Sequence, residues 1–167
     1  GLMIKMLLSK NYIESQVCIA LEEDLGKLGD ITSQATVPQN QKSSAKIKLK
    51  QDAVLCGIDF ACLAFKLLDK KIKISARRKD GSYLKKGSTI LKLHGNTQAI
   101  LAAERTALNF LGLMSGIATK AKNYSKIAKK YGSEIYSTRK TIVGIRDLQK
   151  YALNLSLIHI SEPTRQW

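Results

Sequence analysis

Apolar residues recur along the chain with two different periods, which predict a helix near the N-terminus and strands after it. A helix-like spacing that Ser9 or Asn11 can cap runs through Leu25, and its apolar face consists of Ile13, Val17, Leu21 and Leu25. From Ser44 the period changes to two, because lysines alternate with Ala45, Ile47 and Leu49. This alternation predicts a strand with one wet face, in a half-exposed antiparallel sheet.

Residues 44 to 95, in the middle of the chain, are predicted to form a small α+β layer. Asp59 can cap a short buried helix from Phe60 to Leu68. Apolar positions around Ile72 and Ile74, and from Thr89 to Leu93, predict two further strands. The expected turns are at Gly57, Asp80-Gly81, Gly87 and Gly95-Asn96.

The longest predicted helix opens at Thr97 and runs from Gln98 to about Met114, with apolar residues around nearly its whole circumference. Such a helix is expected to be buried on most sides. Glu104 and Arg105 are its charged residues, and neighbouring helix positions do not face each other, so each needs a different partner. Arg105 is therefore available to a carboxylate, although a structural ion pair remains the alternative.

Two glycine-containing breaks follow. Ser115-Gly116 is expected to interrupt the helix, and a lysine-rich helix with a solvated outer face is expected from Ile117 to Tyr131.

After Gly132, the run from Glu134 to Thr141 predicts a buried strand that ends in Arg139 and Lys140. Two cations at a strand end are typical of an anion site in an α/β barrel, but these residues alone leave a solvated corner equally open. An amphipathic helix with Ile145, Leu148 and Leu153 is predicted next.

Composition narrows the class of protein. The 167 residues suffice for one domain, or for one small domain and a piece of another. The formal charge of +15 would favour nucleic-acid binding, but lysine supplies 22 of the 28 cations and is scattered along the sequence, so no nucleic-acid role is predicted.

No run of apolar residues has the length of a membrane span, and a cytoplasmic location is expected. Cys18, Cys56 and Cys62 lack metal-ligand spacing and are predicted to be small core residues. His94 has no partner ligands near it in the sequence, so no metal site is predicted.

Four motifs, taken together and in this order, resemble the quinolinate phosphoribosyltransferase family. They are Leu21-Glu22-Glu23-Asp24-Leu25-Gly26 with Gly29-Asp30-Ile31-Thr32, then Ala103-Glu104-Arg105-Thr106-Ala107-Leu108-Asn109-Phe110-Leu111, then Leu113-Met114-Ser115-Gly116-Ile117-Ala118-Thr119, and Ser137-Thr138-Arg139-Lys140-Thr141. The resemblance implies an α+β N-terminal sandwich domain over residues 10–111, followed by the truncated start of an α/β barrel over residues 112–154.

The resemblance also implies an activity. Members of this family condense quinolinate with phosphoribosyl pyrophosphate in NAD biosynthesis, and they release nicotinate mononucleotide, pyrophosphate and CO₂ with the help of Mg²⁺. By matching motif, Arg105 would cross a homodimer interface to bind the partner subunit's substrate. Thr138 and Arg139 would bind a quinolinate carboxylate, and Lys140 would contact the substrates as the catalytic cation. The metal-ligating carboxylates would lie beyond residue 154.

Three features depart from the family pattern. Ser137 stands where Asp is usual, and Val143 stands where Pro is usual. Residues 155–167 resemble a translated sequencing adapter and are expected to be a non-native tail. The chain by itself is therefore expected to be inactive, poorly soluble and unable to bind Mg²⁺ tightly. Two alternatives stay open: a related phosphoribosyltransferase-like protein associated with molybdenum transport, and a carrier or binding module with a hammerhead fold.

Overall fold

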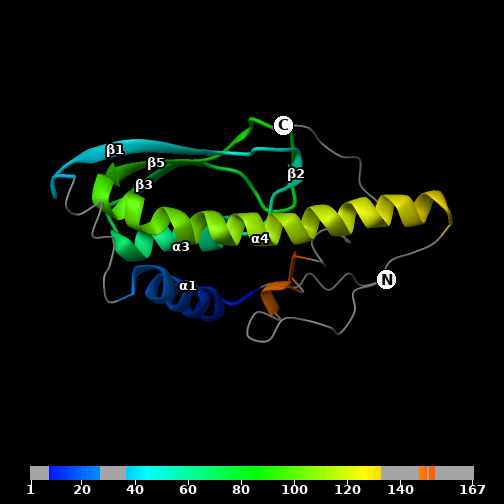
Figure 1. Cartoon of the computed structure of the whole chain (residues 1–167), viewed down its shortest axis with the longest axis horizontal. Helices are drawn as coiled ribbons and strands as arrows, with labels where there is room; N and C mark the ends of the chain where they lie inside the picture. Colours follow the sequence, from blue (N-terminus) through cyan, green and yellow to red (C-terminus); the bar gives the residue numbers. More distant parts are fainter. Residues whose placement is uncertain (1–7, 27–36, 133–146, 150, 153–167) are drawn as a thin grey trace.

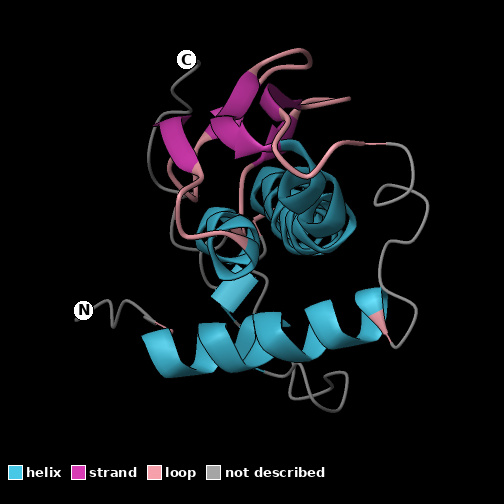
Figure 2. Cartoon of the chain, turned by 90° about the vertical axis from the view of Figure 1, so that its left-hand side faces the viewer, coloured by secondary structure: helices cyan, strands magenta, loops and turns pink. Residues whose placement is uncertain are grey.

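The computed structural model describes residues 8–26, 37–132, 147–149 and 151–152. It has three layers, which Figure 2 shows from one end: strands on top, helices α3 and α4 in the middle, and helix α1 below. This confirms the α+β class expected from the sequence. Among the described residues, no helix is long and apolar enough to cross a membrane.

Helix α1 (Lys10–Leu25) forms the lower layer, as its periodic apolar residues predicted. The Ser9 hydroxyl accepts a hydrogen bond from the Tyr12 backbone N–H (3.1 Å), so the expected cap is present. Val17 and Leu21 are buried against the middle layer. Gly26 ends the helix with a positive φ of 51°, which a residue without a Cβ adopts at little cost.

The upper layer is a three-stranded antiparallel sheet in the order β1–β5–β3. Its strands are β1 (Lys42–Lys48), β3 (Lys73–Arg77) and β5 (Thr89–Asn96). Exposure alternates strictly along β1, as predicted for a strand with one wet face. Gly95 does not close β5 as expected, because it pairs with Ser43 inside the sheet. A Cβ on Gly95 would lie 2.8 Å from Ile72 Cγ1, so glycine permits this close approach.

A short ribbon of β2 (Ala53–Val54) and β4 (Tyr83–Leu84) lies beside the start of α3 (Ile58–Leu68). The sequence pointed to Asp59 as the cap of α3, and this is wrong. The N-cap is Gly57, at a left-handed φ of 100°, and the capping carboxylate comes from the β3–β4 turn. Asp80 accepts hydrogen bonds from the Gly57 N–H (3.0 Å) and the Ile58 N–H (2.9 Å).

Helix α4 (Thr97–Lys130) has 34 residues and is capped by Asn96, whose side chain accepts from the Ala99 N–H. The break expected at Ser115-Gly116 is absent, and Figure 1 shows one helix along the length of the molecule. Ser115 continues the helix because its hydroxyl is bonded to both the N–H and the C=O of Cys56, at 3.0 Å each. Thr119 similarly accepts from the Val54 N–H (3.0 Å), so tertiary contacts hold this stretch helical.

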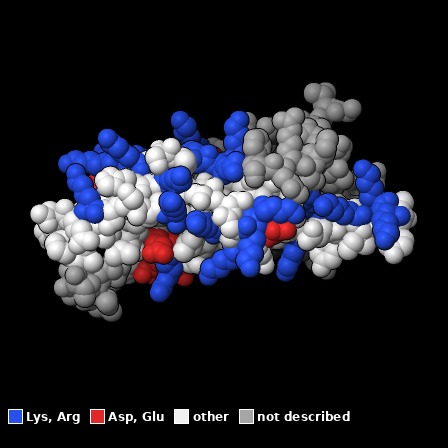
Figure 3. Space-filling view, turned by 90° about the horizontal axis from the view of Figure 1, so that it is seen from above, with Lys and Arg blue, Asp and Glu red and all other residues white. Residues whose placement is uncertain are grey.

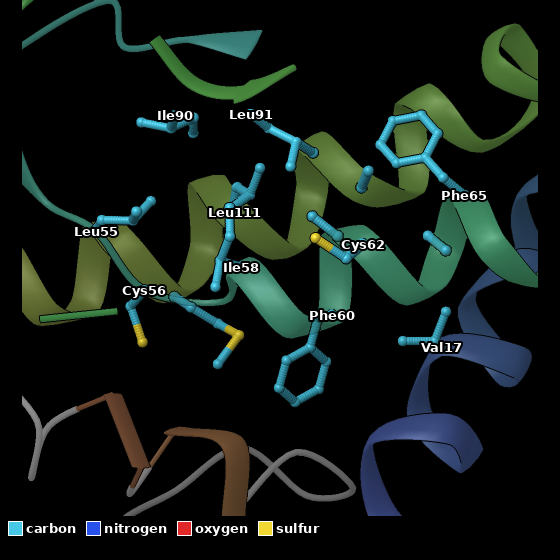
Figure 4. Close-up of a cluster of buried hydrophobic side chains, with 14 of the residues drawn as sticks. Val17, Leu55, Cys56, Ile58, Phe60, Cys62, Phe65, Ile90, Leu91 and Leu111 are labelled. Carbon is cyan, nitrogen blue, oxygen red and sulfur yellow. The ribbon is translucent and has the colours of Figure 1, made fainter. Parts of the chain in front are cut away.

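The core lies between α3, α4 and the inner face of the sheet. In Figure 4, Leu91 of β5, Leu111 of α4 and Ile58 of α3 point toward one another. Cys56 and Cys62 are buried in this core as predicted, whereas Cys18 is partly exposed and is not a core residue. Leu148 and Ala152 of the last described residues are also fully buried against it.

Candidate functional site

Arg105 lies on the outward side of α4. Its helix neighbours Ala103, Thr106 and Ala107 are fully buried against the rest of the domain, and this orientation leaves Glu104 and Arg105 exposed to solvent. The expectation that α4 buries these two charges is therefore wrong for the single chain. An exposed guanidinium keeps its five donors available to an anionic ligand.

One hydrogen bond fixes the inward side of the same turn. The Thr106 hydroxyl donates to the Asp24 carboxylate at the end of α1, although the two residues are 82 positions apart in sequence. Thr106 is completely buried, whereas Asp24 is partly exposed. The contact ties the acidic motif of α1 to the Arg105 turn of α4.

An apolar strip continues from Arg105 along α4. Leu108 and Leu113 keep 41% and 43% of their surface exposed, and Gly112 and Gly116 lie between and after them. Space is open above both glycines, since a Cβ on either would meet no atom within 4 Å. A groove of roughly 490 Å³ borders the strip, with walls that include Ile47, Leu49, Leu108, Leu111 and Gly116. This side of α4 is not covered by the described residues, which corrects the expectation of a helix buried on most sides.

A second hollow, of roughly 390 Å³, lies where the β3–β4 turn meets α3. It is lined by Ile58, Asp59, Arg77, Arg78, Lys79, Asp80 and Tyr151. Asp59 pairs with Arg77 across its rim. Burial raises the pKa of Asp80, and the hydrogen bonds from Ile58, Gly57 and Tyr151 offset part of that effect. Because each of these acidic side chains already has a partner, the hollow offers no unsatisfied carboxylate.

Lysines from the C-terminal half of α4 and from the segment after β4 gather around Tyr83. The Nζ atoms of Lys122, Lys126 and Lys85 lie 4.1, 5.5 and 5.6 Å from the centroid of its ring. Lys122 is buried, so the lysine-rich half of the helix is not the fully solvated face that its sequence suggested. Its pKa is lowered, first by burial and then by the nearby charge of Lys126. Figure 3 shows that lysines and arginines are scattered over the described part of the face seen from above.

The other predicted site residues, Thr138, Arg139 and Lys140, lie outside the described residues, as do Ser137 and Val143. His94 lies on the open face of the sheet, where its Nδ1 is 2.9 Å from the Ser44 hydroxyl. Across the described ranges, no three His, Cys, Asp or Glu side chains gather as metal ligands would.

Comparison with known proteins decides the family. The family model for the quinolinate phosphoribosyl transferase N-terminal domain matches residues 30–115. The chain belongs to this family. The matched range contains β1 to β5, α3 and the Arg105 turn of α4, which are the elements that position the candidate site in this phosphoribosyltransferase domain.

Curated relatives extend the likeness beyond the matched domain. A chloroplastic carboxylating nicotinate-nucleotide pyrophosphorylase of Arabidopsis thaliana is 38% identical over 141 residues, which are 84% of this chain and 40% of the relative. A probable carboxylating nicotinate-nucleotide pyrophosphorylase of Bacillus subtilis is 37% identical over 131 residues, or 78% of this chain and 45% of the relative. The chain thus spans less than half the length of either relative.

Solved structures show the same fold. The nicotinate-nucleotide pyrophosphorylase of Francisella tularensis superposes with a TM-score of 0.83 at 34% identity, over 90% of this chain and 53% of that one. The corresponding protein of Ehrlichia chaffeensis gives a TM-score of 0.81 at 32% identity, over 91% and 54%. The α+β arrangement of this phosphoribosyltransferase domain is therefore that of known family members.

Proposed function

We propose that the chain supplies the N-terminal domain of a quinolinate phosphoribosyltransferase, which acts in NAD biosynthesis. The enzyme would condense quinolinate with phosphoribosyl pyrophosphate and form nicotinate mononucleotide, pyrophosphate and CO₂. The observation that carries the proposal is Arg105, exposed on α4 inside the range that matches the family. The names of the relatives from Arabidopsis thaliana and Bacillus subtilis support the same activity.

The chemistry of the substrates fits the charge of the chain. Quinolinate carries two carboxylates and phosphoribosyl pyrophosphate carries several phosphate charges, so both are drawn to a strongly cationic protein. The chain has a formal charge of +15. A guanidinium can bind a carboxylate through two parallel hydrogen bonds, which orients the acid as well as attracting it. Arg105 is the residue that we assign to this contact.

We further propose that the enzyme is a homodimer in which Arg105 serves the partner's site. Arg105 and the apolar strip of Leu108, Gly112 and Leu113 lie on one uncovered side of α4. An exposed apolar strip next to a ligand-binding cation favours a protein interface at that place. A second copy of the enzyme would cover the strip and receive Arg105.

The remaining roles fall to residues outside the described part of the chain. Thr138 and Arg139 would hold a quinolinate carboxylate, while Lys140 would offset charge that develops as the bond to pyrophosphate breaks. These residues would belong to the start of an α/β barrel over residues 112–154, with the sandwich domain over residues 10–111. Helix α4 crosses from one range to the other without a break.

Mg²⁺ remains part of the proposal for the whole enzyme. The described residues do not fit it, because no three potential ligands gather among them. We therefore derive no step through the metal. The location also stays a prediction: we propose a cytoplasmic enzyme, although relatives are named as chloroplastic or mitochondrial.

The test uses the full-length enzyme and measures CO₂ release from quinolinate and phosphoribosyl pyrophosphate. Arg105→Ala should lower kcat/KM for quinolinate by about a hundredfold, as expected for loss of a charged, bidentate contact, with little change in Tm. Lys129→Ala removes an exposed cation from the same helix and is the matched control. If Arg105→Ala lowered Tm strongly as well as activity, Arg105 would be part of a structural ion pair instead.

Mixed dimers test the assignment across the interface. Arg105→Ala and Lys140→Ala are each expected to lose most of the activity, but a mixed dimer would contain one site with both residues intact. Random mixing should therefore restore roughly a quarter of the wild-type activity if the two residues come from different subunits of a two-fold dimer. No restored activity in verified mixed dimers would place Arg105 and Lys140 in the same subunit's site.

A further inference from the structure

We propose that Asp24 is a positioning residue, which sets the rotation of α4 through Thr106 and thereby aims Arg105. The inference rests on the proposed function, because it gives Arg105 a substrate to meet. It assigns a role to the acidic motif at the end of α1, which the proposed reaction does not otherwise use. Asp24 itself would touch neither substrate.

The position of the hydrogen bond is the first argument. Thr106 Oγ1 donates to Asp24 Oδ2, and Thr106 directly follows Arg105 in α4. Consecutive residues point about 100° apart around a helix of 3.6 residues per turn, so fixing Thr106 inward directs Arg105 away from α1. Thr106 is fully buried and Arg105 is exposed, as this geometry requires.

The second argument concerns what else could fix the rotation. Ala103 and Ala107, the helix neighbours of Thr106 on the buried side, have small side chains without a polar group. Apolar contact is not directional, so these two alanines do not by themselves specify one rotation of the turn. The hydrogen bonds of Ser115 and Thr119 to Cys56 and Val54 also hold α4, but they lie more than two turns further along the helix. A hydrogen bond to a carboxylate is directional and stronger than one between neutral groups. The branched Cβ of threonine further restricts the direction of the hydroxyl.

A rotation of this part of α4 about the helix axis would move the Arg105 guanidinium further than it moves the helix backbone. The guanidinium stands at the end of a long side chain, so a small rotation of the helix displaces the donors by a larger distance. Displacements of about 1 Å can cost a large factor in turnover when a group must meet a substrate in a defined geometry. The Asp24–Thr106 contact is placed where it prevents such a rotation.

The test compares variants of the full-length enzyme. Thr106→Val keeps the shape of the side chain but removes the donor, and Asp24→Asn removes the charge of the acceptor. Both should raise KM for quinolinate about tenfold, an effect of misplaced binding, with kcat nearly unchanged. Thr106→Ser retains the hydroxyl and should keep KM within about twofold of wild type.

Thr97→Val is the matched control. It removes another threonine hydroxyl from the same helix, one that lies 2.5 Å from the Ser43 hydroxyl and eight positions before Arg105. It should leave KM for quinolinate unchanged. Combining Thr106→Val with Arg105→Ala should raise KM no further than Arg105→Ala alone, because the first change acts through the second residue. Additive effects, or an equal rise of KM in Thr97→Val, would overturn the inference.

Amide hydrogen exchange gives a second readout that needs no activity. Thr106→Val and Asp24→Asn should increase exchange in the turn of α4 around residues 103–107, whereas Thr97→Val should not. Unchanged exchange would overturn the positioning role even if the enzyme is active. An inactive wild-type enzyme would instead overturn the proposed function, while altered exchange would still support the contact as the element that fixes α4.

Discussion

The Tyr151 hydroxyl donates a 2.9 Å hydrogen bond to Asp80, the same carboxylate that caps helix α3. Asp80 thereby joins three segments: the β3–β4 turn, the N-terminus of α3, and the last described residues of the chain. Leu148 adds a second link, because its N–H donates to the Tyr12 hydroxyl of α1 at 3.3 Å. The residues that follow the predicted cation motif are thus attached at two places, to the β3–β4 turn and to α1.

The carboxylate of Asp80 should contribute strongly to stability. Asp80→Ala removes the acceptor for two N–H groups at the start of α3 and for Tyr151, so unfolding should require about 2 kcal/mol less free energy. Tyr151→Phe removes a single hydroxyl and should cost about 1 kcal/mol. Urea unfolding followed by circular dichroism measures both. Asp52→Ala is a suitable control, because Asp52 caps an exposed turn through the Lys86 N–H.

The same carboxylate should make stability depend on pH. Burial raises the pKa of Asp80 in the folded state, so protonation of this carboxyl adds stability that is full below the ordinary Asp pKa of about 4 and is lost as pH rises through the higher folded value. Relative to Asp80→Asn, the wild type should therefore lose free energy of unfolding as pH rises from about 4 through that folded value. Parallel curves for the two proteins would contradict the raised pKa.

Two glycines should respond oppositely to alanine. Gly57 has a φ of 100°, and a Cβ there would lie 2.9 Å from Met114 Sδ, so Gly57→Ala should destabilise the fold by about 2 kcal/mol or more. Gly112 lies within α4, where in the single chain an added Cβ would meet no atom within 4 Å, and Gly112→Ala should stabilise the monomeric chain by about 0.5 to 1 kcal/mol. Thermal unfolding of the two variants tests the contrast. Destabilisation by Gly112→Ala would indicate that a second copy covers Gly112 in the proposed dimer.

The three thiols should differ in reactivity. Cys56 and Cys62 are buried and burial raises the pKa of both, so neither should react readily as a thiolate. Cys18 is partly exposed and should be labelled first by a thiol reagent at neutral pH. One fast thiol in the native chain and three after denaturation would confirm this order. Fast labelling of Cys56 would require an opening of the core between α3 and α4.

The sequence predicted the elements whose signals are local. Ser9 before a periodic apolar run identified α1, and the alternation from Ala45 identified β1, because caps and side-chain periodicity depend on neighbouring residues. The Arg105 motif was recognised by its resemblance to the family, which the match over residues 30–115 confirms. Local rules also led to the wrong prediction of a helix break at Ser115-Gly116. The Ser115 hydroxyl is hydrogen-bonded to Cys56 there, and the helix continues.

Contacts between distant residues were not predictable from local pattern. The pairs Asp24–Thr106 and Asp80–Tyr151 are separated by 82 and 71 positions, and neither member of either pair differs in type from an ordinary surface or turn residue. The exposure of Arg105 was missed for a related reason. Composition shows that a helix is apolar, but only the packing of α1, α3 and the sheet determines which side of α4 stays open.

The unbroken course of α4 makes it a lever. Its 34 residues span about 50 Å at 1.5 Å per residue, with one end fixed beside the sheet at Asn96. Ser115 and Thr119 attach the same helix to Cys56 and Val54, so α4 cannot tilt at Asn96 without moving β2 and the segment before α3. A substitution near Asn96 that shifts α4 should therefore also displace residues 54 to 56, although they are about 40 positions earlier in the sequence.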